Sequence, residues 1–390
     1  MRFPEFSGEW KKHSLGEIGE TIIGLTYKPS DVVDNNGIIV FRSSNIKNGM
    51  IDYSDLVRVN KHIKDKIITK ENDILVCARN GSQRLIGKNA IIKQEDANNT
   101  FGAFMMVYRA NDNPFILPLL STKKYFSQVG ENLGARINQI TTSDFNGFEF
   151  YFPENHAERT KIAELFRLLD ERIATQNKII EDLKKLKSAI IEKTFNENYS
   201  NKIRLRDVGS YIRGLTYSSD DVVESNGIFV MRSNNIINGS SLDYHNNIVS
   251  VNKQILTEQQ LQTGDIVICM ANGSSSLVGK SSFYDGDCST PITVGAFCGI
   301  YRSKEPIVKW LFQTNKYRRY IWNSLQGGNG AIANLNGDDI LRMSFSIPAT
   351  PAKDNRIKLL TSVDTLLESN ISLCDLYISQ KLYLLRQMFI

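Results

Sequence analysis

Residues 24–49 read GLTYKPSDVVDNNGIIVFRSSNIKNG, and residues 214–239 read GLTYSSDDVVESNGIFVMRSNNIING. The two stretches are identical at 17 of 26 positions, where unrelated stretches would share about one or two. Residues 73–88 (DILVCARNGSQRLIGK) and 265–280 (DIVICMANGSSSLVGK) match in the same way at 9 of 16 positions. Because the period of about 190 residues is close to half of the 390-residue chain, the repeat predicts two tandem domains rather than a solenoid of short units.

Each copy changes its texture after a proline, Pro153 in the first copy and Pro348 in the second. Before the proline, short β-branched runs broken by Asn-Gly pairs predict strands and hairpins, interrupted by one helix per copy at residues 114–129 and 306–324. After it, glycine is almost absent and apolar residues recur at helical spacing. The predicted fold class is therefore α+β. Its segments are two globular domains at residues 1–155 and 198–350, and two long helices at residues 156–197 and 351–390.

Each long helix carries an apolar stripe that must be covered by something else. The residues expected to pair the helices are Leu165, Leu169, Ile173, Ile180, Leu183 and Ile190 in the first, and Leu360, Leu367, Ile371, Ile378 and Leu385 in the second. Because the two stripes can cover each other, the sequence predicts an antiparallel coiled coil about an approximate two-fold axis. The alternative is that each helix packs only on its own globular domain. The basic run 184–187 is interpreted as a solvated flank of the coiled coil, with a DNA-facing patch as the alternative.

The composition is that of an ordinary globular protein, with 41% hydrophobic, 23% charged and 9% aromatic residues. No apolar run approaches the roughly 18 to 20 residues that span a bilayer, and the first residues show no secretory signal, so we expect no membrane partner and a cytoplasmic location. The five cysteines and four histidines show no zinc-binding spacing, so no metal site is expected. A net charge of +5 permits an acidic partner such as nucleic acid without demonstrating one.

Two motifs look like enzyme sites but lack a required feature. Residues 273–281 (GSSSLVGKS) place five residues between Gly273 and Gly279, whereas a phosphate-binding P-loop has four. Residues 112–115 (DNPF) lack the second proline of the motif with which adenine methyltransferases hold a flipped base, and no glycine-rich cofactor loop follows a strand. The sequence therefore predicts no catalytic residue, and a P-loop enzyme is kept only as an alternative hypothesis.

Polar and basic side chains recur in the loops of both copies and are the candidate DNA contacts. They are Tyr27, Arg42, Ser43, Ser44, Asn45, Arg79, Asn80, Ser82, Gln83, Arg84, Lys88, Lys124 and Arg136 in the first copy, and Tyr217, Arg232, Ser233, Asn234, Asn235, Asn272, Ser274, Ser275, Ser276, Lys280, Lys316 and Arg318 in the second. Arginine can bond O6 and N7 of guanine, and asparagine or glutamine can bond N6 and N7 of adenine, so direct readout needs these residue types. The basic residues on the expected short helices could contact phosphates. The alternative is that the Asn-Gly and Ser-Gly clusters only make turns.

The order of these landmarks, which occurs twice, resembles the specificity subunit of type I restriction-modification systems over essentially the whole chain. The landmarks are the opening residues 2–10 (RFPEFSGEW), the domain entries 15–18 (LGEI) and 205–208 (LRDV), the segments 42–46 and 232–236, the hairpins 81–88 and 273–280, and the exits 150–153 (FYFP) and 345–348 (FSIP). No single landmark is specific to that family, but their duplicated order is.

The resemblance implies a non-catalytic subunit with two target recognition domains, each of which binds one half of a split site in double-stranded DNA. It also implies that the paired helices set the gap between the half-sites, and that two methyltransferase subunits and two restriction subunits bind this chain. S-adenosylmethionine, ATP and Mg²⁺ would belong to those partners, and this chain would hold no cofactor. A free-standing bipartite DNA-binding protein, such as a repressor, is the alternative.

The two copies are unusually alike, so the half-sites are expected to share some base pairs. The copies differ at Arg79 against Ala271, at residues 83–84 against 275–276, and at residues 136–137 against 332–333. We expect the half-sites to diverge where these residues contact bases.

Overall fold

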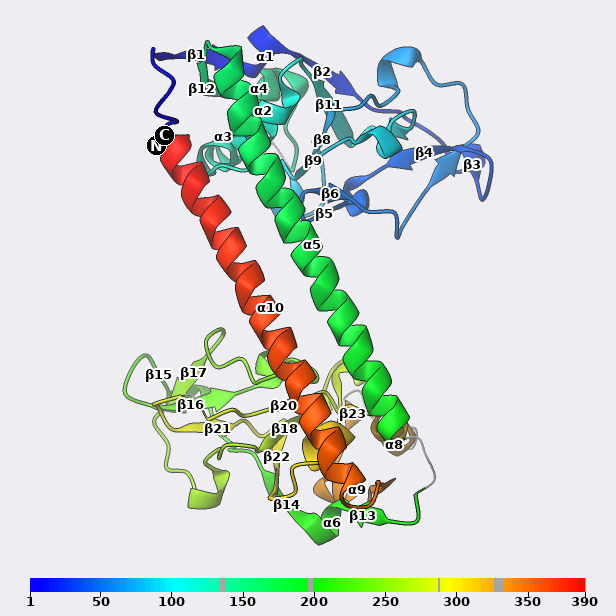
Figure 1. Cartoon of the computed structure of the whole chain (residues 1–390), viewed down its shortest axis with the longest axis vertical. Helices are drawn as coiled ribbons and strands as arrows, with labels where there is room; N and C mark the ends of the chain where they lie inside the picture. Colours follow the sequence, from blue (N-terminus) through cyan, green and yellow to red (C-terminus); the bar gives the residue numbers. More distant parts are fainter. Residues whose placement is uncertain (134–137, 196–198, 287, 326–332, 390) are drawn as a thin grey trace. The chain divides into compact units, whose positions relative to one another are not determined.

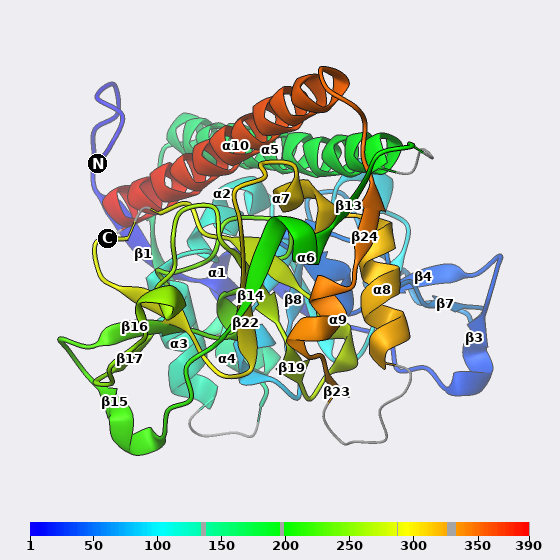
Figure 2. The ribbon, with the colours of Figure 1, turned by 90° about the horizontal axis from the view of Figure 1, so that it is seen from below.

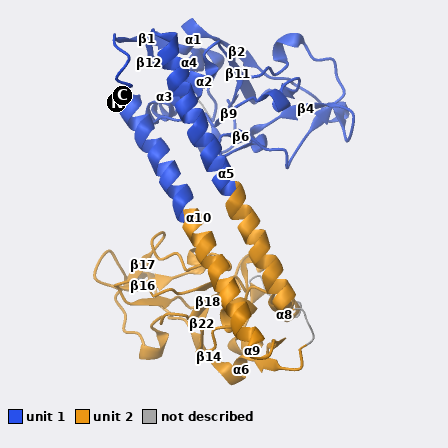
Figure 3. Cartoon of the chain, viewed as in Figure 1, with its two compact units in different colours: residues 1–177, 372–390 blue, residues 178–371 orange. Residues whose placement is uncertain are grey.

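The computed structural model describes residues 1–133, 138–195, 199–286, 288–325 and 333–389. They form two compact units, one of residues Met1–Asn177 with Ser372–Ile390 and one of residues Lys178–Ile371 (Figure 3). Each unit holds sheets, short helices and a part of both long helices, so the predicted α+β fold class is confirmed (Figure 1). None of the helices in the described ranges combines the length and the apolar character needed to cross a membrane.

Unit 1 is built on two four-stranded sheets. The first is antiparallel, with the order β2-β11-β8-β9, and the second has the order β10-β4-β7-β3 with a parallel β10–β4 pair. The strands are β2 Glu20–Ile23, β3 Val32–Val33, β4 Ile38–Phe41, β7 Arg58–Val59, β8 Ile74–Cys77, β9 Asn89–Ile91, β10 Thr100–Phe101 and β11 Met105–Arg109. Two smaller pairs complete the unit, β1 (Trp10–Ser14) with β12 (Glu149–Pro153) and β5 (Ile46–Lys47) with β6 (Met50–Ile51).

The apolar run of β8 is buried on both faces of its sheet. Successive strand residues point to opposite faces, so Ile74 and Val76 enter one hydrophobic cluster while Leu75 and Cys77 enter another. The first cluster also contains Phe166 of the long helix α5, whereas the second lies against the β10-β4-β7-β3 sheet through residues such as Phe41. This strand therefore packs against the long helix on one face of its sheet and against the second sheet on the other.

Unit 2 repeats the two four-stranded sheets with equivalent strand orders. Its sheets have the orders β14-β22-β18-β20 and β15-β17-β16-β21, and two short pairs join β13 to β24 and β19 to β23. The strands are β13 Lys202–Arg204, β14 Gly209–Arg213, β15 Val222–Val223, β16 Ile228–Met231, β17 Val249–Val251, β18 Ile266–Cys269, β19 Ala271–Asn272, β20 Ser281–Phe283, β21 Ile292–Val294, β22 Cys298–Ser303, β23 Ala333–Asn334 and β24 Ser344–Ser346. Within this unit, the β15-β17-β16-β21 sheet and the short helices α8 and α9 lie on opposite sides of the other sheet (Figures 1 and 2).

The helices are α1 Leu15–Ile18, α2 Asn113–Leu119, α3 Lys123–Leu133, α4 Thr142–Asn146, α5 His156–Phe195, α6 Leu205–Val208, α7 Val308–Leu311, α8 Asn315–Leu325, α9 Gly337–Leu341 and α10 Ala352–Met388. The prediction of one continuous helix at 114–129 and one at 306–324 is wrong, because each is two helices. A threonine makes the break: the Thr122 hydroxyl donates to Leu119 O at 2.7 Å and accepts from Tyr125 N at 3.2 Å. Thr314 makes the same pair of bonds in unit 2.

Buried polar groups are paired in the same way in both units. The Tyr108 hydroxyl donates to Leu15 O at 2.9 Å, and the Tyr301 hydroxyl donates to Leu205 O at 2.7 Å. A second tyrosine of each unit lies under the hairpin loop, where its hydroxyl donates to the carbonyl of a glycine: Tyr125 to Gly87 at 2.8 Å and Tyr317 to Gly279 at 2.7 Å. These bonds join distant parts of the chain and satisfy groups that burial would otherwise penalise.

The long helices pair in an antiparallel manner within unit 1. Lys381 Nζ donates to Asp170 Oδ1 at 2.5 Å, and Cys374 Sγ donates to Asn177 Oδ1 at 3.6 Å, so residue numbers rise along α5 as they fall along α10. The end of α10 then joins the core of the unit, where the Phe389 ring stacks on Phe166 with centroids 5.7 Å apart.

The helices also pair within unit 2. Lys187 Nζ donates to Asp364 Oδ1 at 2.5 Å, and Leu360 shares a hydrophobic cluster with Ile191 and Phe195. Both helices bury or half-bury residues at alternating spacings of three and four, as a coiled-coil seam does. The seam residues are Ile162, Phe166, Leu169, Ile173, Gln176, Ile180, Leu183, Lys187, Ile190 and Thr194 on α5, and Leu360, Val363, Leu367, Asn370, Cys374, Tyr377, Lys381, Leu384 and Met388 on α10.

The prediction that Ile371 and Ile378 pair the helices is wrong. Both residues lie outside the seam, with 36% and 39% of their surfaces exposed. From Leu367, alternate steps of three and four lead to Asn370, Cys374 and Tyr377, so a stripe drawn through aliphatic residues alone runs one position off the seam. Leu165 and Leu385 are also off the seam, but they pack against the core of unit 1.

The basic run 184–187 needs a further correction. Lys187 is buried, whereas its neighbour Leu186 is 49% exposed. The interpretation of this run as a solvated flank is therefore wrong for Lys187, which occupies a seam position opposite a carboxylate.

Candidate nucleic-acid interface

A cleft of about 660 Å³ on unit 2 gathers residues from four separate loops. Five of the predicted DNA contacts line it, namely Tyr217, Arg232, Ser233, Asn234 and Asn272. The polar clusters 232–235 and 272–276 lie about 40 positions apart in the sequence, and the fold brings both to one surface. The cleft therefore combines a guanidinium, two amides, a hydroxyl and an aromatic ring, which suits recognition of base edges.

Two contacts hold the walls of the cleft together. Asn272 Nδ2 donates to Ser233 Oγ at 3.3 Å, which links the hairpin that follows β18 to the loop that follows β16. Leu215 forms an isolated parallel bridge with Gly295, so the loop that carries Tyr217 is tied to the turn before β22. The side chains are thus displayed from a fixed backbone rather than from long free loops.

Unit 1 makes the equivalent contacts. Asn80 Nδ2 donates to Ser43 Oγ at 2.9 Å, and Leu25 forms a parallel bridge with Gly102. The predicted residues Tyr27, Arg42 and Ser43 are half-buried around this junction and Ser44 is exposed. The same joining of the two polar clusters therefore occurs twice in the chain.

The hairpin loops present the residues that distinguish the copies. β8 pairs with β9 and β18 with β20, so the predicted hairpins are present, and each loop contains one turn of 3₁₀ helix. In unit 1, Asn80 Oδ1 accepts from Ser82 N at 3.0 Å, which leaves Gln83, Arg84 and Arg79 exposed. In unit 2 the predicted contacts Ser274, Ser275 and Ser276 are exposed in the hairpin loop, and Lys88 and Lys280 are half-buried at the hairpin bases.

The predicted DNA contacts at Asn45 and Asn235 need correction, because both side chains are completely buried. Asn45 Nδ2 donates to the carbonyls of Asp52 and Asp55 at 3.0 and 2.8 Å, and its Oδ1 accepts from Arg42 N at 2.9 Å. Asn235 makes the matching three bonds in unit 2. Both amides are committed to partners inside the protein, so the prediction that they contact DNA is wrong.

The predicted lysines on the short helices α3 and α8 contact other parts of the fold than the polar loop clusters. Lys124 Nζ lies 4.9 Å from the centre of the Tyr151 ring on β12, and Lys316 Nζ lies 5.7 Å from that of Phe345 on β24. Burial lowers the pKa of Lys316, and this residue does not line the cleft. Arg318 is exposed on α8, and Arg136 lies outside the described residues. A phosphate contact by Lys124, Lys316 or Arg318 stays a prediction.

Phe104 in unit 1 and Phe297 in unit 2 lie beside the polar loop clusters and were not predicted from the sequence. They occupy equivalent Gly-Ala-Phe turns and are 59% and 67% exposed. The Arg79 guanidinium lies 5.1 Å from the centre of the Phe104 ring, and Phe297 lines the cleft. The sequence signal that could have identified these two phenylalanines is the Gly-Ala-Phe turn, which occurs in both copies.

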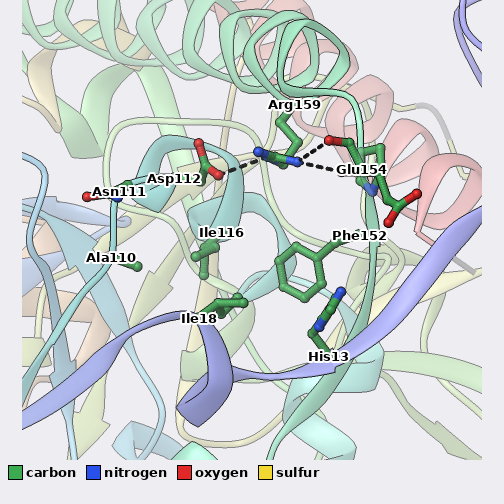
Figure 4. A pocket seen from close by; sticks show the side chains of 10 residues that line it. His13, Ile18, Ala110, Asn111, Asp112, Ile116, Phe152, Glu154 and Arg159 are labelled. Atoms are coloured by element: carbon green, nitrogen blue, oxygen red, sulfur yellow. Dashed lines mark hydrogen bonds and ion pairs between the residues drawn. The ribbon is translucent and has the colours of Figure 1, made fainter.

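A smaller cavity of about 240 Å³ lies in unit 1 where β12 leads into α5 (Figure 4). Arg159 spans it, with Nε 2.9 Å from Asp112 Oδ2 and Nη1 donating to Pro153 O at 2.7 Å and Glu154 O at 3.0 Å. Because these internal partners occupy the guanidinium, the cavity belongs to the junction that holds the start of α5. No cluster that could hold a metal ion occurs among the residues described.

Comparison with known proteins finds similarity to DNA specificity subunits. A family model described as the type I restriction modification DNA specificity domain matches residues 7–185. The EcoKI specificity subunit of Escherichia coli (strain K12) is 25% identical over 294 residues, which cover 69% of this chain and 63% of that protein. The StySPI specificity subunit of Salmonella potsdam is 23% identical over 370 residues, which cover 87% of this chain and 78% of that protein.

One solved structure matches the fold of the whole chain. The S subunit of the type I restriction-modification system from M. genitalium matches with a TM-score of 0.61 at 16% identity, over 100% of this chain and 99% of that chain. The fold is thus that of a DNA specificity subunit with duplicated domains. Residues 7–185 thus match the type I restriction modification DNA specificity domain, and both relatives are specificity subunits of type I restriction enzymes, the class that the duplicated landmarks resemble. The chain spans less than two thirds of the length of the first relative, the EcoKI subunit.

Proposed function

We propose that this chain is the non-catalytic specificity subunit of a type I restriction-modification complex. Each unit binds one half of a split site in double-stranded DNA, and the chain directs partner subunits that methylate adenine or cleave DNA. The observation that carries the proposal is the duplicated junction of two polar loops, Ser43 with Asn80 and Ser233 with Asn272, each surrounded by exposed groups that can bond base edges.

The chemistry of the junctions favours DNA over a small ligand. The loops around the cleft on unit 2 present arginine, asparagine and serine toward solvent. A base pair in the major groove offers donors and acceptors at its edge that these groups can match. A modest net charge of +5 is compatible with this function if enclosing partners supply part of the phosphate contact.

The catalytic activities are assigned to partners. Two methyltransferase subunits would supply S-adenosylmethionine and the pocket for a flipped adenine, and two restriction subunits would use ATP and Mg²⁺. The relatives support this assignment because each is named as the specificity subunit of a type I restriction enzyme. In this proposal the chain contributes sequence recognition and the surfaces on which those partners assemble.

The hairpin loops are proposed to make the half-sites different. Arg79, Gln83 and Arg84 of unit 1 face solvent, and their counterparts in unit 2 are Ala271, Ser275 and Ser276. Long side chains that can hydrogen-bond guanine or adenine in unit 1 are thus replaced in unit 2 by short side chains that reach less far. The shared residues around both junctions, such as Tyr27 and Tyr217, would read the base pairs that the half-sites have in common.

An exchange of hairpins tests the proposal. Residues 79–84 are replaced by the sequence of 271–276, the variant is expressed with its methyltransferase, and the methylated adenines are sequenced across the host genome. We expect one half-site to change toward the other while the remaining half-site is retained. The matched control replaces residues 34–36 by the sequence of 224–226, a turn whose third residue has a φ of 57° in one copy and 59° in the other, and should leave the site unchanged. An unaltered methylated sequence in the hairpin variant would contradict base reading by this loop.

A further inference from the structure

Phe104 and Phe297 are exposed although their backbones are firmly held. Phe104 O accepts hydrogen bonds from Ala78 N and Arg79 N, both at 3.0 Å, and Phe297 O accepts from Met270 N at 2.8 Å and Ala271 N at 3.1 Å. A turn closes behind each ring through Met105 N to Gly102 O and through Cys298 N to Gly295 O, both at 2.8 Å. The two rings are therefore displayed by a rigid turn with the same bonds in the two units.

Each exposed ring directly precedes a buried residue of the next strand. Met105 and Cys298, the residues that follow the phenylalanines, are buried in the sheet. In both units an exposed aromatic ring thus stands immediately before a strand that begins with buried residues. An apolar ring kept in water gives up the stabilisation that burial of such a side chain would supply.

The surroundings of the rings identify what they can contact. Phe297 lines the cleft beside Tyr217, Arg232 and Asn272, groups suited to base edges rather than to an apolar protein surface. In the major groove the one apolar feature of a base edge is the C5-methyl group of thymine, which phenylalanine can contact. In unit 1 the guanidinium of Arg79 stands over the Phe104 ring, so a cation accompanies the apolar contact there and is replaced by Ala271 in unit 2.

We propose that Phe104 and Phe297 each contact the C5-methyl group of one thymine, one in each half-site. This inference rests on the proposed function and adds a specificity-determining residue to each unit. Because the two turns are alike, the thymine occupies an equivalent place in both half-sites, and it is one of the base pairs that they share.

The test uses the assembled complex of this chain with its methyltransferase and a duplex that carries the methylated site. Each thymine of the half-sites is replaced in turn by deoxyuridine, which lacks only the methyl group, and the affinity is measured. We expect one thymine per half-site at which the replacement weakens binding about fourfold, the effect of losing one buried methyl-sized contact. With Phe297→Ala the penalty should disappear in one half-site, and with Phe104→Ala in the other, whereas Phe→Leu at either position should retain part of it.

Phe126→Ala is the matched control, because Phe126 is a 47% exposed phenylalanine on α3 and should leave every penalty in place. Penalties that persist in both alanine variants would overturn the inference, and so would the absence of a sensitive thymine in either half-site. An equal loss of affinity for all duplexes would overturn it too, since that result indicates non-specific stacking. If the hairpin exchange changes the methylated site while deoxyuridine has no effect, this inference fails and the proposed function stands.

Discussion

At the residue scale, neighbouring amides of one loop have opposite roles. Asn234 and Asn235 are adjacent residues of one type in the loop that follows β16. Asn235 is completely buried with three internal hydrogen bonds, whereas Asn234 is exposed in the cleft. The composition of the loop identifies it as a polar surface segment, but only the fold shows which of the two side chains turns inward.

The opposite roles give a prediction at the residue scale. Asn235→Ala leaves three backbone groups without the partners that the amide supplies, so we expect the free energy of unfolding to fall by about 2 kcal/mol or more. Asn234→Ala should change it by less than about 0.5 kcal/mol, because that side chain is exposed. Urea denaturation of both variants checks the stabilities. Equal stabilities would contradict the structural role of Asn235.

At the element scale, the coiled-coil seam contains a duplicated ion pair. Asp170 and Lys187 on α5 have counterparts Asp364 and Lys381 on α10, both at an offset of 194 residues. Each lysine bonds the aspartate of the other helix, Lys381 to Asp170 in unit 1 and Lys187 to Asp364 in unit 2. Hydrophobic periodicity predicted the extent of the helices but not these seam positions, because it scores charged residues as solvent-facing.

The two pairs differ in burial, which gives a matched comparison. The side chains of Lys187 and Asp364 are 8% and 7% exposed, and those of Lys381 and Asp170 are 20% and 43% exposed. Lys187→Met leaves Asp364 buried with Lys309 as its remaining cation, so we expect a loss of about 3 kcal/mol or more. Lys381→Met should cost about 1 kcal/mol or less, since Asp170 can be hydrated.

Thermal and urea denaturation of the two variants provide the measurement. Burial lowers the pKa of Lys187, because desolvation of the ammonium outweighs the attraction of Asp364. The double variant Lys187→Met with Asp364→Leu should recover most of the stability, because the buried carboxylate is gone and Lys309, whose side chain is 29% exposed, can be hydrated. If Lys187→Met and Lys381→Met were equally mild, burial would not govern the strength of these pairs.

At the scale of the whole molecule, the duplication explains what could be predicted. The repeat predicted two tandem domains, each with strands followed by a long helix, since each landmark appears twice and one copy checks the other. The break at Thr122 and Thr314 was missed, because the flanking segments are both helical and only the hydroxyl bonds separate them. Phe104 and Phe297 were missed because an apolar residue beside a strand is normally expected in the core, and only the fold shows that both rings are exposed.

The central claim is that the two units read the two halves of one split DNA site. Sequencing of methylated adenines in cells that express this chain with its methyltransferase tests it most directly. We expect a single motif of two defined half-sites with some base pairs in common, separated by a gap of fixed length and undefined sequence. A continuous motif, or methylation that does not depend on this chain, would contradict the claim.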